Sequence, residues 1–158
     1  MRFLVAAALL VALPAGAQTP LRATAPDGFK FTSHEAIDKS VSMPAEAGRT
    51  YSAAIMNDHE NYHVEFVKRI DHGNIAEAHA HWADYITITS GEGILTFGGT
   101  LSDAKDAGLG EVHGSIMTGA STQAVHAGDY LQIPPGMPHK FDAAPGKTLV
   151  YVVFKART

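Results

Sequence analysis

Apolar and polar residues alternate over much of the chain after residue 50, as they do in β-strands that bury one face. Residues 62–70 (YHVEFVKRI) show this alternation most clearly, with the period of two that predicts a sheet. Residues 129–133 and 148–154 are two further apolar runs next to turn-forming residues. We expect a strand in each, and the second run is apolar enough to predict burial on both faces.

The segment over residues 84–97 (DYITITSGEGILTF) is predicted to form a β-hairpin. Two β-branched runs flank Gly91 and Gly93, and glycines permit the positive φ angles of a tight turn. Residues 100–110 contain few large apolar side chains and predict a surface loop, after which residues 112–117 suggest another strand.

Near the N-terminus, Ser33 is expected to cap a short helix that ends near Val41, because a serine oxygen accepts hydrogen bonds from the first free amides of a helix. The sequence shows neither a long helical pattern nor an internal repeat. Many short strands in a chain of 158 residues predict one all-β domain, either a sandwich or a barrel.

The first 17 residues have the features of an export signal. An apolar run over residues 3–13 is followed by Ala15-Gly16-Ala17, which has the small residues of a signal-peptidase site. The run is shorter than the roughly 20 residues that span a bilayer, so a retained membrane anchor is the less favoured interpretation. We expect a signal peptide over residues 1–17, cleavage after Ala17, an N-terminal arm over 18–45 and a barrel domain over 46–158.

Composition narrows the partners and the chemistry. The chain has 12 Lys and Arg against 16 Asp and Glu, a formal net charge of −4, and its basic residues do not cluster. This argues against nucleic acid, and against anionic membrane surfaces once the signal has been cleaved. Cysteine is absent, although an exported protein could have used disulfides. Any metal ion is therefore held by nitrogen and oxygen ligands.

Two histidines one residue apart, His79 and His81, are the first candidates for such ligands. In an extended strand, residues i and i+2 point to the same side and lie roughly 7 Å apart, a span that two imidazoles can close onto one ion. The alternative is a pair of exposed or hydrogen-bonded strand histidines without a ligand.

The surroundings of these histidines resemble the two cupin motifs, G-x5-H-x-H-x3-4-E-x6-G and G-x5-P-x-G-x2-H-x3-N. The second motif is matched in GDYLQIPPGMPHKF, residues 128–141, through its histidine, His139. The resemblance covers roughly residues 62–154 and is closest to small single-domain cupins. The first motif is matched at Gly73, His79, His81 and Gly91.

The resemblance implies a single-domain, cupin-type jelly-roll β-barrel with a short N-terminal helix or arm. It also implies that His79, His81 and His139 form a three-imidazole set around one divalent transition metal ion, with open positions for a ligand. Fe, Mn, Zn, Ni and Cu all suit such a set, and the sequence does not choose among them.

Two carboxylates near the histidines are further candidates. Counting back seven residues from Gly91 reaches Asp84, which we align with the glutamate of the first motif, although it follows His81 after only two residues. Asp84 is either a fourth ligand or a turn aspartate that accepts from backbone amides. Glu77 shares the strand parity of the histidines and is a candidate catalytic base or an orienting partner for a histidine. An outward salt bridge is the alternative for Glu77.

The function expected from the resemblance is that of a metal-dependent enzyme, with dioxygenase-type oxidation of a small oxygen-bearing organic substrate as the first hypothesis. Two alternatives stay open, since the fold hosts many activities: a periplasmic binding protein without turnover, and a metal-dependent lyase or isomerase. A homodimer through a β edge is also expected, because the run over 148–154 is so apolar.

Overall fold

The computed structural model describes residues 28–42, 50–73 and 75–158. The expected signal peptide, with its cleavage site, and much of the expected arm lie outside the described residues. The chain divides into two compact units, Met1–Phe31 and Thr32–Thr158, and all the elements below belong to the second unit. Within the described ranges, no helix combines the length and the apolar character needed to cross a membrane.

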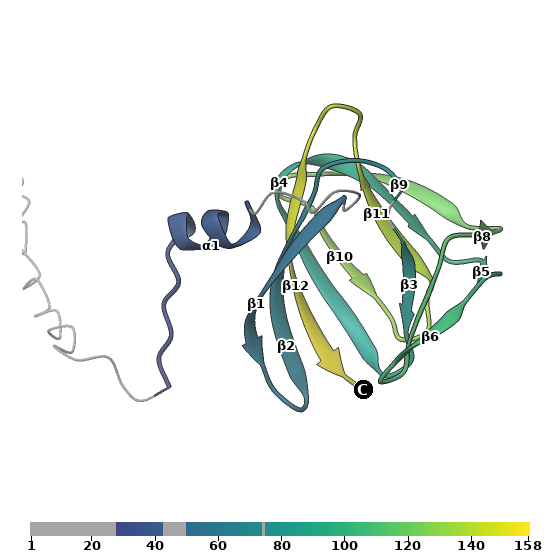
Figure 1. The fold of residues 1–158 in the computed structure, drawn as a ribbon, viewed down its shortest axis with the longest axis horizontal. Coiled ribbons are helices and arrows are strands. Elements are labelled where there is room, and N and C mark those ends of the chain that lie inside the picture. Colours follow the sequence, from purple (N-terminus) through teal and green to yellow (C-terminus); the bar gives the residue numbers. More distant parts are fainter. Residues whose placement is uncertain (1–27, 43–49, 74) are drawn as a thin grey trace, which may run out of the picture. The chain divides into compact units, whose positions relative to one another are not determined.

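The second unit is built almost entirely of antiparallel strands, so the all-β prediction is confirmed. Figure 1 shows the strands curling around a common interior. The elements are α1 (His34–Val41), β1 (Tyr51–Asp58), β2 (Tyr62–Arg69), β3 (Ala76–His79), β4 (Trp82–Phe97), β5 (Thr100–Leu101), β6 (Lys105–Gly108), β7 (Glu111–Gly114), β8 (Met117–Thr118), β9 (Ser121–His126), β10 (Tyr130–Ile133), β11 (His139–Ala143) and β12 (Leu149–Arg157).

Helix α1 forms as the sequence predicts. The side chain of Ser33 accepts a hydrogen bond from the amide of Ala36 at 3.2 Å, and Glu35 lies in the first turn, where a negative charge is favourable. Val41 is buried at the other end of the helix. Ser52, in β1, donates a hydrogen bond to the carbonyl of Val41, so this end of the helix is tied to the first strand.

The expected hairpin over residues 84–97 is wrong, because these residues belong to one continuous strand, β4. The first half of β4 pairs with β12 on one side and with β10 on the other. The second half pairs with β11 and β9. Strand β4 therefore passes from one part of the curled sheet to the next, and a jelly-roll arrangement replaces the local hairpin.

Glycine allows this passage because β4 and the start of β12 approach each other closely. Gly91 has a φ of +80°, and a Cβ atom at this position would lie 1.8 Å from the carbonyl oxygen of Thr148. The register between β4 and β12 shifts here, between Val150 and Tyr151. The unpaired residue of this bulge is Thr89, so the glycines of the GEG segment lie within the strand, just after a bulge, and not in a hairpin turn.

The expected surface loop over residues 100–110 is also corrected, because it contains the short strands β5 and β6. Strand β6 pairs with β7, and β5 pairs with β8. Every residue of β6 is exposed, so its side chains carry no apolar signal. Backbone hydrogen bonds to a neighbouring strand hold it in place, and these do not depend on side-chain type.

Strand β12 differs from its prediction in one respect. Its burial alternates along the strand, and Phe154 is 41 % exposed, so one face is buried rather than both. Within the described sheet, β12 lies between β2 and β4 and is not an edge strand. The apolar character of this strand therefore gives no support to pairing through a β edge, and the homodimer stays a prediction.

The apolar core lies at one end of the strands, where the inward side chains of β4, β11 and β12 meet. Ile86 faces Val153, and Ile88 faces Tyr151, in the register of β4 and β12. Phe141 of β11 packs against Tyr151 with ring centroids 4.8 Å apart. The next inward pair of the same ladder is Asp84 and Lys155, so the interior changes from apolar to charged along the strands.

Candidate metal centre

Three neighbouring strands carry histidine and glutamate side chains to the charged end of the interior. Strand β3 lies between β11 and β7. Glu77 of β3 is paired with His139 on one side and with His113 on the other, and His79 is paired with Glu111. Paired residues of antiparallel strands project on the same side of the sheet. The strand register therefore gathers five candidate ligand side chains on one surface.

One group consists of Glu77, His79 and His139, whose potential ligand atoms all lie within 4.8 Å of one another. The Nε2 atom of His139 is 3.5 Å from Oε1 of Glu77, and Nε2 of His79 is 4.0 Å from the same oxygen. Asp84 joins the group from β4, with Oδ2 at 3.4 Å from Nε2 of both histidines. Two imidazole nitrogens and two carboxylates thus converge.

The rings of both histidines are oriented by hydrogen bonds, so that each turns Nε2 toward the group. The Nδ1–H of His139 donates to the carbonyl of Met137 at 3.0 Å. Lys155 donates to Nε2 of His79 at 2.8 Å, which places the ring proton of His79 on Nδ1, 3.6 Å from Oε1 of Glu111. Partners of this kind set the tautomer and orientation of metal-binding histidines.

His139 and the two carboxyls of this group shift one another's pKa values in the direction that favours the charged form. Burial alone lowers the pKa of His139, but hydrogen bonds to Asp84 and Glu77 outweigh it and raise that pKa to about 9. Burial alone raises the pKa of each of the two carboxyls. Hydrogen bonding with His139 and the positive charge of Lys155 overcome this effect and hold both pKa values well below their usual range. Both carboxylates are therefore ionised at neutral pH.

The residues fit a divalent cation. Asp84 is 2 % exposed, and within the described structure its buried Oδ1 has no hydrogen-bond partner, an unusual state for a carboxylate oxygen. The cavity beside the group is lined by four carboxylates against two permanent cations, Arg69 and Lys155, so negative charge is in excess before the histidines are counted. Mixed nitrogen and oxygen ligands suit Mn, Fe, Co, Ni or Zn.

Lys155 takes part in the same group. Its ammonium lies 3.8 Å from Oδ2 of Asp84, in addition to its hydrogen bond with His79. An ion bound to Nε2 of His79 requires this ammonium to move away, since both need the same lone pair. Lys155 and a metal cation are therefore competitors for the same ligands.

His81 does not lie in this group. Strand β3 ends at His79 and β4 begins at Trp82, so His81 occupies a bend, where it is exposed. The expectation that His79 and His81 share one strand face is therefore wrong, because the chain turns between them and the period of two ends. The carbonyl of His81 accepts a hydrogen bond from the amide of Thr158 at 3.0 Å.

The spacing of the first motif also fits a second alignment, in which His81 is not one of the motif's histidines. The motif places three or four residues between its second histidine and its acid, and four residues separate His79 from Asp84. With His79 as the second histidine, the first histidine position falls on Glu77. In this alignment the departure at Asp84 disappears, and two others replace it: Glu77, which retains a ligand side chain, and Asp71, which stands where the motif has its first glycine.

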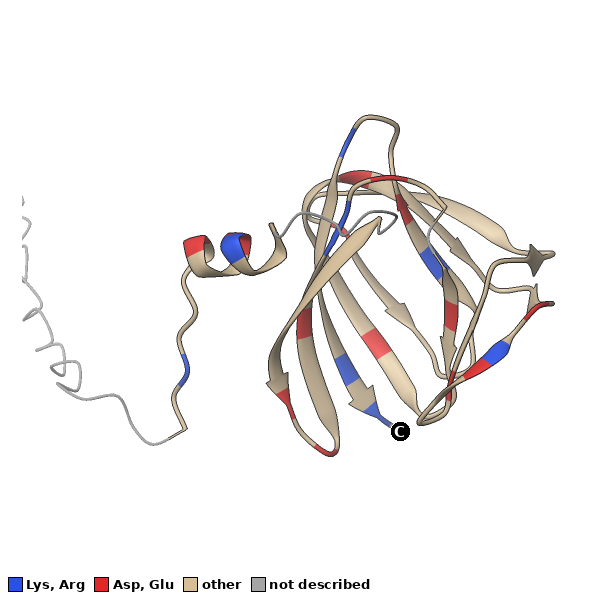
Figure 2. Cartoon of the chain, in the orientation of Figure 1, with Lys and Arg blue, Asp and Glu red and all other residues tan. Residues whose placement is uncertain are grey.

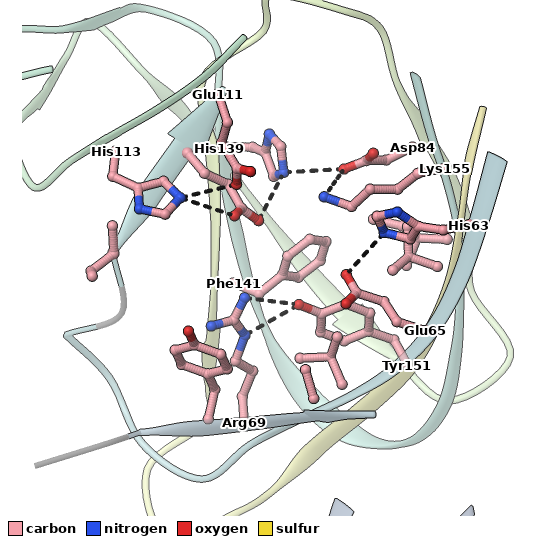
Figure 3. A pocket seen from close by; sticks show the side chains of 17 residues that line it. His63, Glu65, Arg69, Asp84, Glu111, His113, His139, Phe141, Tyr151 and Lys155 are labelled. Atoms are coloured by element: carbon pink, nitrogen blue, oxygen red, sulfur yellow. Dashed lines mark hydrogen bonds and ion pairs between the residues drawn. The ribbon is translucent and has the colours of Figure 1, made fainter. Parts of the chain in front are cut away.

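The cavity beside the group has a volume of about 250 Å³. Figure 3 shows Arg69 and Tyr151 on one side of it and Asp84, His139 and Lys155 on the other. The hydroxyl of Tyr151 accepts hydrogen bonds from Nε and Nη2 of Arg69 at 3.1 and 3.0 Å. The Arg69 guanidinium also lies 4.7 Å from the centre of the Tyr51 ring.

Strand β2 contributes polar residues that the sequence analysis did not select. His63, Glu65 and Arg69 all line the cavity, and they follow the period of two. Burial raises the pKa of Glu65 despite the opposing charges of Lys155 and His63. The alternation over residues 62–70 could have shown that these side chains share a face with Val67. It could not have shown that this face lies opposite the histidines.

Outside this group, the charged residues of the described part include both acidic and basic side chains. Figure 2 shows acidic and basic residues interspersed over the strands of the described part. His126, which lies outside the group, is exposed and pairs with Asp129 at 3.7 Å.

Comparisons with known proteins give the fold. No protein-family model matches the chain, and no curated protein matches it. A conserved protein with a double-stranded β-helix domain from Klebsiella pneumoniae superposes with a TM-score of 0.53 and 18 % identity, over 81 % of this chain and 90 % of that one. Two further solved structures are similar at lower scores.

One is the polyketide cyclase RemF from Streptomyces resistomycificus, with a TM-score of 0.49, 19 % identity and coverage of 69 % of this chain and 68 % of that one. The other is a cupin 2 conserved barrel domain protein from Rhodopseudomonas palustris, with a TM-score of 0.47, 21 % identity and coverage of 70 % and 66 %. The chain has a double-stranded β-helix fold, and histidine and glutamate side chains that could hold a metal ion gather in the described part of its interior.

Proposed function

We propose that the chain is a metal-dependent enzyme that oxidises a small oxygen-bearing organic substrate. One observation carries the proposal: two imidazoles and a carboxylate, from His79, His139 and Glu77, place ligand atoms within 4.8 Å of one another beside a cavity. Two histidines and one carboxylate with open positions are typical of non-haem iron oxygenases. Asp84 adds a second carboxylate to this set.

The bound ion would act as a Lewis acid and as a template for substrate oxygen atoms. The chain's own residues prepare its site. Met137 fixes the ring of His139 through its carbonyl, and the lowered pKa values of Glu77 and Asp84 keep both groups anionic. A group with so low a pKa is a poor proton acceptor at neutral pH. We therefore assign Glu77 to the ion rather than to the base.

Substrate binding is assigned to the opposite side of the cavity. Arg69 supplies a permanent positive charge there, and Tyr51 and Tyr151 hold its guanidinium. A cavity of about 250 Å³ suits a small molecule. We propose a substrate with a carboxylate, enolate or phenolate oxygen toward Arg69 and further oxygen atoms toward the ion.

A second candidate is a lyase or isomerase that moves a proton next to a carbonyl. The observation that favours it is Glu65, a cavity-lining carboxyl whose pKa is raised by burial. A raised pKa makes a carboxyl a better proton acceptor than an ordinary carboxylate. In both candidates Glu65 is the proposed proton carrier, and the candidates differ in whether oxygen is consumed.

The test compares two histidine variants of the full chain. His139→Ala removes a ligand, whereas His126→Ala removes an exposed histidine and serves as the control. Each protein is stripped with a chelator, reloaded with Fe(II), Mn(II) or Zn(II), and assayed with catechols and β-diketones for oxygen uptake and for proton exchange by NMR.

We expect oxygen uptake by the unmodified protein and by His126→Ala, and only background uptake by His139→Ala. Proton exchange without oxygen uptake would support the second candidate instead. Ligand-induced shifts in melting temperature without any product would contradict both and leave a binding protein.

A further inference from the structure

A second group of ligand side chains lies next to the first, on strand β7. Glu111 and His113 are two residues apart and are paired with His79 and Glu77 of β3. Figure 3 shows His113 pointing toward the carboxylate of Glu111, on the same side of the cavity as His139. Both residues line that cavity.

The distances within this second group are as short as those in the first. The Nε2 atom of His113 is 2.9 Å from Oε1 of Glu111 and 4.0 Å from Oε2 of Glu77. Potential ligand atoms of Glu77, Glu111 and His113 all lie within 4.8 Å of one another. One imidazole and two carboxylates form a donor set suited to a divalent transition metal.

Glu77 belongs to both groups, and its two oxygens face different histidines. Oε1 lies 3.5 Å from Nε2 of His139, whereas Oε2 lies 4.0 Å from Nε2 of His113. The strand register causes this division, because His139 and His113 flank Glu77 on the two neighbouring strands. Two-metal sites hold their ions roughly 3.5–4 Å apart, a distance that one carboxylate spans with an oxygen toward each ion.

We propose that Glu77, Glu111 and His113 bind a second divalent cation, and that the carboxylate of Glu77 bridges it to the ion at His79 and His139. The bridging part of this proposal rests on the proposed function. The three ligand side chains of the second group are 24 %, 36 % and 41 % exposed, whereas His79 and His139 are almost fully buried. The second ion is accordingly the weaker and more rapidly exchanging one, and it faces the cavity, where it can hold a second oxygen atom of the substrate.

A simpler role for the same residues makes a different prediction. Oε1 of Glu111 lies 3.6 Å from Nδ1 of His79, so Glu111 and His113 could merely orient the ligands of a single ion. Orienting partners change the affinity of one ion, often 10–100-fold when removed. They do not change the number of ions that bind.

The experiment counts ions in the full chain. Chelator-stripped protein is titrated with Mn²⁺ or Zn²⁺ alone, and the bound metal is measured by equilibrium dialysis with elemental analysis. His113→Ala and Glu111→Gln remove ligands of the second group, His139→Ala removes a ligand of the first, and His126→Ala is the control. Circular dichroism confirms that each variant is folded. Mn²⁺ electron paramagnetic resonance reports magnetic coupling between two bridged ions.

We expect two ions in the unmodified protein and in His126→Ala, with coupled Mn²⁺ spectra, and one uncoupled ion in both His113→Ala and Glu111→Gln. A single ion that is lost in His139→Ala but kept in both second-group variants would overturn the second site and leave the proposed function standing. A single ion that is lost in His113→Ala but kept in His139→Ala would support the second group and overturn the first. No bound ion would overturn both.

Discussion

The same strands line both ends of the barrel interior, with apolar side chains at one end and charged side chains at the other. In the β4–β12 ladder, Ile88 pairs with Tyr151 and Ile86 with Val153, and one step further Asp84 pairs with Lys155. Strand β11 makes the same change, from Phe141 to His139. The apolar end stabilises the fold by burial. The charged end costs desolvation energy, a cost that the proposed metal binding would offset.

The largest effect is expected from Leu149→Ala at the apolar end. Leu149 is fully buried, and loss of such a side chain destabilises a protein by about 2–5 kcal/mol. Urea unfolding measures the free energy, and metal analysis of the folded fraction should show unchanged stoichiometry. Ile94→Ala, at a position 44 % exposed, is the control and should cost less than about 1 kcal/mol. Equal losses in the two variants would contradict the burial comparison.

Gly91→Ala tests the close approach of β4 to the residue before β12, at the middle of the strand that lines both ends. An alanine Cβ would meet the carbonyl oxygen of Thr148, and the positive φ is strained for any side chain. We expect a loss of about 1–3 kcal/mol. Gly146→Ala has a similar φ of +70° but nothing within 4 Å of the added atom, so it measures strain alone. If Gly91→Ala unfolds at the same urea concentration as Gly146→Ala, the close approach is not what requires glycine.

Lys155→Met sharpens the comparison by making the charged end less cationic. The ammonium competes for Nε2 of His79 and Oδ2 of Asp84, so its removal should tighten metal binding about tenfold, or ~1.4 kcal/mol. Competition with a chelator of known affinity measures the change. Lys140→Met, which removes a lysine paired with Asp142, should leave the affinity unchanged. Weaker binding by Lys155→Met would show that the lysine supports the site rather than opposing it.

The pH dependence of metal binding tests the charge of His139 at this end. His139 has a pKa raised to about 9, so an ion must displace its proton at lower pH, and affinity should fall about tenfold for each unit below pH 9. Without metal, the same shift stabilises the fold fully below the ordinary pKa of 6.5, and this contribution is lost as the pH rises through 9. Chelator competition from pH 6 to 9 measures the affinity. A flat profile would contradict the raised pKa.

The sequence predicted the parts of this molecule that local pattern determines. The capped helix follows from Ser33, and the strands follow from their alternation. His79, Asp84 and His139, which the motif resemblance selected, lie close together, and their binding of a metal ion stays a prediction. His81 was misplaced because the alternation continues through Ala80 and Trp82, although the strand ends at His79.

Other parts depend on pairing between distant segments, which local pattern does not contain. The GEG segment has hairpin composition, yet it lies within β4 because the partner strands β11 and β12 come from the end of the chain. Glu111 and His113 become candidate ligands only through the register of β7 with β3. Arg69 faces the same cavity because β2 curls around to meet β12.

The most direct test of the metal centre compares two histidines that are one residue apart. His79→Ala and His81→Ala are each loaded with Zn²⁺, washed, and analysed for bound metal per folded chain. His79 lies in the buried group and His81 in the exposed bend. We expect loss of the tightly bound ion in His79→Ala and full retention in His81→Ala. Retention in His79→Ala, or loss in His81→Ala alone, would contradict this expectation.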